Sequence, residues 1–284
     1  MAKPFQHRIQ YLNNKPIHPK LLANLLLLWG SMVSHADELA IDSVSKVLEK
    51  ANMLYSEAKF EDARTAFEQA ISLDKGSLTA WRGLGWSHWE LGQKQRAYQI
   101  WQDLHQAFPS DLPTLLALAK ASEQDQLWDD ATRYYSQALI LSPNQLSAQL
   151  GQARVFIAQH QFQPAEQAAR SALLNAPSDN NTKSLLADAL LGQTRFQEAE
   201  PLLRQLVKAK PVPFNQLRLA KAITEIGQYQ QAAEIYQTSF MSHNDASILT
   251  AWRSLGTRLR KAGDKQGAYQ VWQLILQTVP TDNA

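Results

Sequence analysis

The stretch AWRGLGWSHWELGQKQRAYQIWQDLHQAFP, Ala80–Pro109, recurs near the end of the chain as AWRSLGTRLRKAGDKQGAYQVWQLILQTVP, Ala251–Pro280. Aligned without gaps, the two stretches are identical at 15 of 30 positions. Unrelated helices do not reach such identity by chance. The chain therefore contains an internal repeat, which predicts an array of small supersecondary units.

The same frame runs through the chain between these two stretches. An alanine marks each unit, and successive alanines are 34 residues apart except for one step of 33 and one of 36: Ala63, Ala97, Ala131, Ala165, Ala199, Ala232 and Ala268. Twelve residues before each alanine stands another small residue, and four residues after it an aromatic or apolar one in every unit. Proline closes five of the seven units, at Pro109, Pro143, Pro177, Pro211 and Pro280.

This frame predicts a pair of helices in each unit. Apolar residues recur at steps of three and four, as in Trp81, Leu84 and Gly85, which is the period of a helix. Small residues let the two helix backbones approach closely, and the aromatic side chain fills the remaining gap. Gly-Gln and Gly-Asp steps such as Gly92-Gln93 and Gly192-Gln193 suit the turn between the helices. The proline then ends the second helix.

The period and the pattern W-x-x-L-G…A-x-x-x-[FYW]…P, best seen in Trp81–Pro109 and Trp252–Pro280, resemble the tetratricopeptide repeat family. The resemblance implies an all-α, right-handed α-solenoid of about seven helix hairpins that binds proteins. The units would lie near residues 44–77, 78–111, 112–145, 146–179, 180–212, 213–248 and 249–284. They form one continuous array over residues 37–284 and leave no room for a separate catalytic domain. The long step at Ser239–Ser247 is expected to be a loop, either a hinge or a harmless insertion.

The first 36 residues have the pattern of a secretory signal peptide. Four basic residues precede the first acidic residue, Asp37: Lys3, Arg8, Lys15 and Lys20. A short apolar stretch, Leu21–Val33, and the small-x-small end Ser34-His35-Ala36 follow them. We expect cleavage after Ala36 and export to the periplasm, with a peripheral location at the outer membrane left open. An uncleaved anchor is the alternative, but the apolar stretch is short for a membrane span, so no anchor is expected after cleavage.

Charge and composition exclude several classes of function. The whole chain has 28 Lys and Arg against 26 Asp and Glu, but its excess of positive charge lies in the leader, so nucleic acid is not expected as a partner. The chain has no Cys, which excludes disulfides, thiolate zinc sites and a Cys nucleophile. No histidine pair has metal-ligand spacing, and His88 falls in a core-facing row. We expect no enzyme activity, no metal and no cofactor.

The resemblance also implies where a partner binds, because first helices line the concave surface in this family. One inner row would contain Asn52, Trp86, Lys120, Arg154, Asp188, Lys221 and Thr257. Trp86 and Trp89 do not fit the core rows and are the strongest candidates for aromatic anchors beside cations. The candidate groove residues are Arg82, Trp86, Trp89, Lys120, Arg154, Asp188, Lys221, Arg253 and Arg260. Their basic excess predicts an extended or helical partner segment, apolar with an acidic excess, unless these charges are merely solvated.

The leading hypothesis is a non-catalytic periplasmic scaffold that binds a protein partner in this groove, within an envelope assembly or secretion machine. One alternative is the repeat portion of an exopolysaccharide synthesis or export factor that contacts a polyanionic glycan, an acidic polysaccharide, or a glycan-modifying enzyme. Another is a non-enzymatic assembly chaperone that captures an unfolded polypeptide end. The repeat pattern by itself is compatible with all three.

Overall fold

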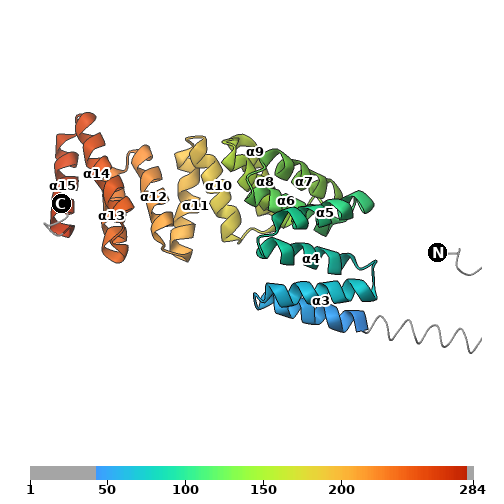
Figure 1. Ribbon diagram of the computed structural model, residues 1–284. Helices are drawn as coiled ribbons and strands as arrows, with labels where there is room; N and C mark the ends of the chain where they lie inside the picture. Colours follow the sequence, from blue (N-terminus) through green and yellow to red (C-terminus); the bar gives the residue numbers. More distant parts are fainter. Residues whose placement is uncertain (1–42, 280–284) are drawn as a thin grey trace, which may run out of the picture. The chain divides into compact units, whose positions relative to one another are not determined.

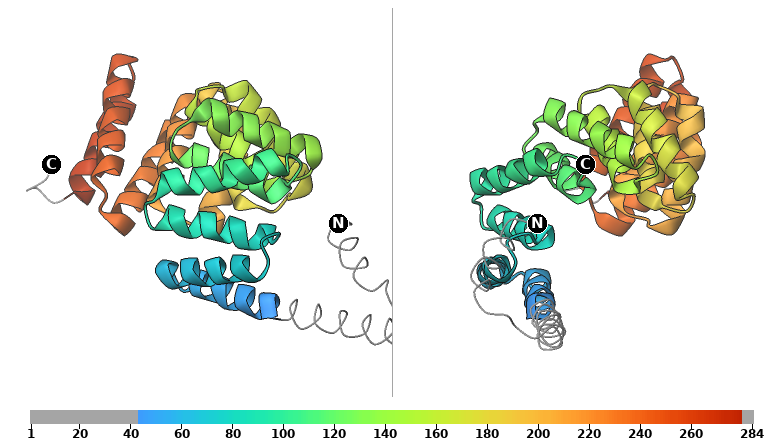
Figure 2. Two further views of the ribbon diagram at one scale, coloured as in Figure 1. Left: turned by 45° about the vertical axis from the view of Figure 1, so that its right-hand side comes forward. Right: turned by 90° about the vertical axis from the view of Figure 1, so that its right-hand side faces the viewer.

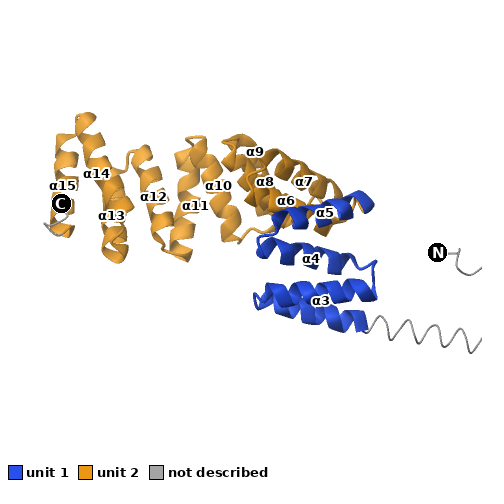
Figure 3. Ribbon diagram, viewed as in Figure 1, with its two compact units in different colours: residues 1–107 blue, residues 108–284 orange. Residues whose placement is uncertain are grey.

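The structure is a computed structural model that describes residues 43–279, which contain helices and turns but no strand. The prediction of an all-α array of helix hairpins is confirmed. The chain divides into two compact units, Met1–Ala107 and Phe108–Ala284 (Figure 3). A run of hairpins can be compact by itself because each repeat contacts only its neighbours. The predicted signal peptide, residues 1–36, lies outside the described residues.

The first unit is a stack of two hairpins in its described part. Residues 43–56 are helical and pair with α3 (Phe60–Leu73), and α4 (Leu78–Glu90) pairs with α5 (Lys94–Ala107). Figures 1 and 2 show these helices lying one upon another. The core of the first hairpin contains Phe67, which is 1% exposed and packs with small residues of both its helices.

The second unit contains five hairpins in its described part, each made of a first and a second helix (Figure 1). The first helices are α6 (Leu112–Gln124), α8 (Leu146–Ala158), α10 (Asn180–Gly192), α12 (Pro213–Ile226) and α14 (Ala246–Lys261). The second helices are α7 (Trp128–Leu141), α9 (Phe162–Asn175), α11 (Phe196–Ala209), α13 (Tyr229–His243) and α15 (Lys265–Thr278).

The repeated small residues form the close contact between the two helices of a hairpin, as predicted. Every alanine of the repeat frame is at most 3% exposed. A Cβ atom added at Gly85 would lie 2.3 Å from Nε1 of Trp101, so the first helix can approach the second only with a glycine there. Trp101 itself is fully buried. The small residue and the large one therefore fit together as a pair, which sets the spacing of the hairpin.

Local sequence signals explain where the helices begin and end. Ser77, Asp111, Asp179 and Asp245 each cap a first helix by accepting a hydrogen bond from a backbone N–H. The helices α5, α7, α9 and α11 end two residues before the prolines of the repeat frame, as predicted.

One predicted turn position is wrong. Gly192 is the last residue of α10, and Thr194 takes the positive φ of 57° in the turn that follows. Gly192 instead permits close packing, because a Cβ there would lie 2.3 Å from the Phe162 ring. The Gly-Gln signal at this turn therefore reflected a contact between helices rather than backbone conformation.

The predicted loop at Ser239–Ser247 is also wrong. The second helix α13 continues to His243, Asn244 ends it in the left-handed conformation, and Asp245 caps α14. The extra residues lengthen α14 to 16 residues, against 13 in α4, α6, α8 and α10. The connection between α13 and α14 is thus only two residues long, so the long step in the repeat frame is absorbed by helix.

Among the described residues, no helix is long and apolar enough to cross a membrane.

Candidate partner-binding face

The candidate residues of the first unit belong to α4, and they are more buried than the sequence predicts. Trp89 is only 7% exposed, so the interpretation that it lies outside the core is wrong. Its ring packs against Trp101 and Tyr98 of α5, with centroid separations of 6.0 and 5.7 Å. Lys94 Nζ covers the ring at 4.7 Å. A side chain enclosed in this way stabilises the hairpin and offers little area to a partner.

Trp86 and Arg82 are partly buried on the same helix. The centroid of the Trp86 ring lies 4.7 Å from that of Trp101, so the two indoles pack against each other. Arg82 donates from Nη2 to Thr79 Oγ1 at 3.2 Å. His88 is 7% exposed and its Nδ1 lies 2.8 Å from Gln93 Oε1, which confirms the prediction of a packed histidine.

In the second unit, three ion pairs link neighbouring first helices. The first joins α6 to α8: Arg154 approaches both carboxylate oxygens of Glu123, at 2.5 and 3.0 Å. Tyr135 also donates to this carboxylate, at 2.6 Å. Burial and the neighbouring carboxylate raise the pKa of Tyr135 above its ordinary value. Arg154 therefore has a partner inside the protein, which reduces its value as a docking cation.

The second pair joins α10 to α12 and is the most buried of the three. Arg218 contacts Asp188 at 2.6 Å, and their side chains are 9% and 32% exposed. Two further hydrogen bonds run from Arg218 to the hydroxyl and the carbonyl of Ser184, at 2.9 and 3.0 Å. Burial raises the pKa of Asp188, and the Arg218 charge opposes this rise. Asp188, a predicted groove residue, thus holds Arg218 in place, which the sequence analysis did not foresee.

The third pair joins α12 to α14, where Arg258 makes a bidentate contact with Glu225. The hydrogen bond from Arg258 lowers the pKa of Glu225, and partial burial opposes this. These two residues fix the register between α12 and α14. The two helices run in the same direction, since α12, α13 and α14 follow one another through connections of two residues (Figure 1).

The remaining predicted cations of the second unit lie at its surface. Lys120, Lys221 and Arg260 are exposed, and Arg253 is half-buried. Lys221 lies one helical turn before Glu225, and Arg253 about one turn before Arg258. Arg258 of α14 reaches Glu225 of α12, whereas Arg253 and Arg260 lie roughly 140° and 160° round α14 from Arg258, on the side away from α12. Positive charge therefore gathers on α12 and α14.

An exposed aromatic residue on this face was missed by the sequence analysis. Phe214, in the first turn of α12, is 61% exposed. Its ring stacks on the guanidinium of Arg218 at 4.9 Å. The signal was present in the sequence, because Phe214 precedes Lys221 by seven residues and so shares its side of the helix.

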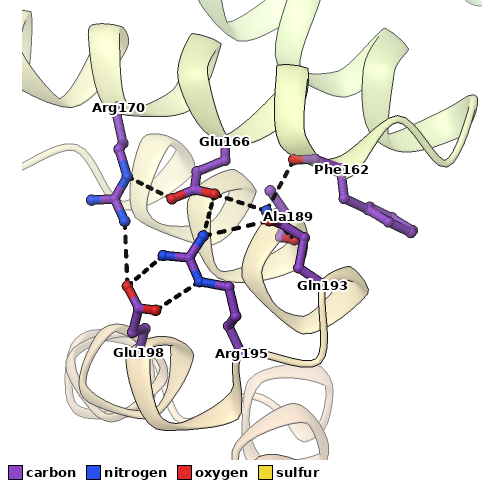
Figure 4. Close-up of polar contacts among 7 residues, drawn as sticks. All are labelled: Phe162, Glu166, Arg170, Ala189, Gln193, Arg195 and Glu198. Atoms are coloured by element: carbon purple, nitrogen blue, oxygen red, sulfur yellow. Dashed lines mark hydrogen bonds and ion pairs between the residues drawn. The ribbon is translucent and has the colours of Figure 1, made fainter.

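A second polar cluster lies around Glu166, and its charged groups bond to one another (Figure 4). Glu166 of α9, only 7% exposed, accepts hydrogen bonds from Arg170, Gln193 and Arg195 at 2.8, 2.8 and 2.5 Å. Burial alone would raise the pKa of Glu166, but these donors together lower it. Arg195 also binds Glu198 of α11 at 2.6 and 2.7 Å. The cluster joins neighbouring hairpins and is structural.

A hollow of about 950 Å³ lies between α13 and α15, and its lining differs from the candidate face. Glutamines such as Gln230 and Gln273 line it, together with apolar residues such as Val271 and Leu274. Its charged residues, Glu234 and Asp264, are both acidic. This hollow therefore does not suit an acidic partner. No group of three or more potential metal ligands occurs among residues 43–279.

Comparisons with known proteins agree with the repeat pattern. A family model described as tetratricopeptide repeat matches residues 48–111 and 184–239. A segment of 116 residues, 39% of the chain, is 29% identical to transcription factor tau subunit sfc4 of Schizosaccharomyces pombe. The match spans only 12% of that protein.

Solved structures with the same fold cover most of the chain. A tetratricopeptide repeat protein from Parabacteroides merdae is similar with a TM-score of 0.59 and 14% identity, over 85% of this chain and 95% of that one. PilF of Pseudomonas aeruginosa gives a TM-score of 0.67 and 10% identity over 76% and 98%. YrrB, described as having an unusual peptide-binding site, gives 0.54 and 14% over 64% and 93%. With its 34-residue frame, its hairpins and these similarities, the chain is a tetratricopeptide repeat protein.

Proposed function

We propose that this protein is a non-catalytic periplasmic scaffold that binds a protein partner on the exposed face of its first helices, within an envelope assembly or secretion machine. Tetratricopeptide repeat proteins are generally scaffolds that bind proteins or peptides without catalysing a reaction. The proposed periplasmic location is supported by residues 1–36, whose basic, apolar and small-residue segments have the order of a signal peptide.

The observation that carries the binding site is the distribution of charge on α12 and α14. Lys221, Arg253 and Arg260 lie there with Arg258 and Lys261, against the single carboxylate of Glu225. Arg258 is paired with Glu225, and two further arginines, Arg154 of α8 and Arg218 of α12, are paired with acidic residues of the protein itself. The face of α12 and α14 therefore suits a partner with an acidic excess.

A pull-down from envelope extract tests this site. We expect the double variant Lys221→Glu, Arg260→Glu to lose the partner that the wild type retains. The double variant Lys208→Glu, Lys210→Glu is the matched control, because it makes the same charge change at exposed positions at the end of α11. Equal retention by both variants would refute the proposed face.

Export is tested separately by the mass of the protein purified from the periplasm. We expect a chain that begins at Asp37, the residue after the predicted cleavage site. Protein found only in the cytoplasm, or exported protein that still carries Met1, would contradict this part of the proposal.

A further inference from the structure

We propose that the hollow between α13 and α15 is a second binding site, which takes a short, extended peptide segment that is neutral or basic and carries one aliphatic side chain. The side-chain amides of the hollow hold the backbone of this segment, and its apolar residues receive the aliphatic side chain. Because α13 and α15 are both second helices, the site is distinct from the first-helix face of the proposed function and does not depend on it.

Glutamine dominates the lining of the hollow. Seven of its sixteen lining residues are glutamines: Gln228, Gln230, Gln231, Gln237, Gln270, Gln273 and Gln277. Three of these side chains form hydrogen bonds with Arg204, Thr278 and Tyr269. The other four form none within residues 43–279. Each free amide offers N–H donors and a carbonyl acceptor, which are the groups that a peptide backbone needs as partners.

The glutamines lie in two opposed stripes. Gln230 and Gln237 are seven residues apart on one side of α13, and Gln270 and Gln277 are seven residues apart on one side of α15. The two helices run in the same direction, and Gln237 donates to Thr278 at 3.0 Å, which sets their register. Gln237 is therefore roughly level with Gln277, and Gln230 with Gln270. The two levels are about 10 Å apart, a distance that an extended chain covers in about three residues.

The least exposed residues of the lining are aliphatic. Ala233 and Leu259 are 2% exposed and Val271 is 3% exposed. Leu274, which also lines the hollow, is half-buried and so offers apolar surface. An aliphatic side chain of the segment gains free energy by burying its surface there. A sugar ring would bring hydroxyl groups against residues that offer them no hydrogen bond, so a peptide fits this part of the hollow better than a glycan.

The charged residues of the lining favour a neutral or basic segment. They are Glu234 and Asp264, both acidic. Asp264 caps α15, where its carboxylate accepts a hydrogen bond from the backbone N–H of Gly267 at 2.8 Å. Glu234 is exposed and forms no ion pair in the part of the chain that the structure describes. Its carboxylate is therefore available to a Lys or Arg side chain of the segment.

Selection from a random library of linear decapeptides on the whole immobilised chain tests the site. The library is first depleted on the double variant Gln230→Met, Gln270→Met, which removes peptides that bind elsewhere. Methionine has nearly the length of glutamine but lacks the amide. We expect the peptides then enriched on the wild type to share an aliphatic residue and to lack an acidic excess.

The affinities of the enriched peptides are measured by fluorescence anisotropy with labelled synthetic copies. The double variant should bind them about tenfold more weakly, because backbone groups of the peptide lose their partners. Glu234→Gln should weaken the binding of peptides that carry Lys or Arg about threefold at low salt and less at high salt.

The double variant Gln197→Met, Gln205→Met is the matched control. Both glutamines are exposed on α11, outside the hollow, and Gln197 occupies the row of the repeat frame that Gln230 occupies in α13. This variant should leave affinity unchanged. Circular dichroism of each variant checks that the fold is intact.

Several outcomes would overturn the proposed site. They are failure to enrich any peptide after depletion, enriched peptides that bind all variants equally, and enriched peptides that require an acidic residue. Maltohexaose, a neutral oligosaccharide, is titrated as the alternative ligand. Saturable binding of this sugar that Gln230→Met, Gln270→Met abolishes, without any enriched peptide, would assign the hollow to a glycan instead. The pull-down described above decides the proposed function separately, because its test variant changes only α12 and α14.

Discussion

Two first helices carry large aromatic residues that the periodic core rows do not explain, and they use them differently. On α4, Trp89 is 7% exposed because Trp101 and Tyr98 of α5 enclose it. On α12, Phe214 is 61% exposed, and its ring is supported from within the same helix by Arg218. An aromatic side chain outside the core rows is thus available to a partner only where the paired helix leaves it uncovered.

The cations show the same contrast within the second unit. Arg154 and Lys221 occupy the same row of the repeat frame. Arg154 makes a bidentate contact with Glu123, whereas Lys221 is exposed and its helix neighbour Glu225 is already bound to Arg258. Equivalent positions therefore differ in function according to the acidic residue that the neighbouring hairpin supplies.

The largest effect on stability is expected when Trp101, the centre of the aromatic cluster of α4 and α5, is truncated. Trp101→Ala removes a fully buried ring that three other aromatic rings contact. We expect the free energy of unfolding to fall by about 3–5 kcal/mol, because the truncation leaves a large cavity. Urea denaturation followed by circular dichroism measures this loss. A loss below about 1 kcal/mol would show that the cluster does not hold the hairpin together.

A smaller loss of stability is expected when a methyl group is added beside Trp101, at Gly85. Gly85→Ala places a Cβ atom 2.3 Å from Trp101 Nε1, so the ring or the helix must shift. Overpacking of this kind costs about 1–3 kcal/mol. Gln95→Ala, at an exposed position of α5, serves as the control and should change stability by less than about 0.5 kcal/mol. If both variants denature alike, the close approach at Gly85 is not required.

Removing the support of Phe214 should have a pH-dependent effect. Arg218→Gln takes the cation away from Asp188, and we expect a loss of about 1–3 kcal/mol at pH 7. Burial already raises the pKa of Asp188 against the effect of Arg218, so without Arg218 it rises further. A carboxyl group whose folded pKa exceeds its unfolded value destabilises the folded state as pH rises above about 3.9.

The difference in stability between wild type and Arg218→Gln should therefore grow from pH 4 to pH 7. Urea midpoints at four pH values across this range measure it. Arg133→Gln, which breaks a pair whose side chains are 53% and 49% exposed, is the control and should show almost no difference at any pH. If the loss of stability in Arg218→Gln were the same at every pH, the pKa of Asp188 would not depend on Arg218.

The smallest effect on stability is expected at Phe214 itself. Phe214→Ser removes an exposed ring and one cation–π contact, so its cost should be at most about 1 kcal/mol. Thermal denaturation of this variant beside Trp89→Ser makes the comparison direct, because the buried tryptophan should cost several times more. Comparable losses in the two variants would show that Phe214 packs as a core residue and is not available to a partner.

Much of the fold could be predicted because the repeat frame fixes which positions are small and buried. Ala63, Ala97 and their equivalents are enclosed as expected. The repeat frame did not predict the structure correctly where one step between units was longer than the others. The extra residues near Ser239–Ser247 resembled a loop, but α13 and α14 lengthened to include most of them. A helix can grow at its ends wherever the next hairpin still packs, and the repeat period alone does not reveal this.

Less of the candidate site could be predicted. The sequence placed Lys221, Arg253 and Arg260 on the first helices, and all three lie on α12 or α14. It overestimated how available Trp89 and Arg154 are to a partner, and it missed Phe214, Arg218 and Arg258. Apart from Phe214, whose contact with Arg218 lies within α12, each of these errors concerns a contact between hairpins or between the two helices of one hairpin. The partners in such contacts are about 30 residues apart in sequence for Glu123 with Arg154 and for Asp188 with Arg218.

The sequence by itself determined the repeat, the hairpin and the inward rows, because helical periodicity and the spacing of small residues are local properties that recur every 34 residues or so. The tertiary structure alone decided which side chains of the first helices remain available to a partner. Availability depends on what the adjacent helices place over or beside each residue, as Trp101 does for Trp89 and Glu123 for Arg154. These neighbours come together only when the hairpins pack.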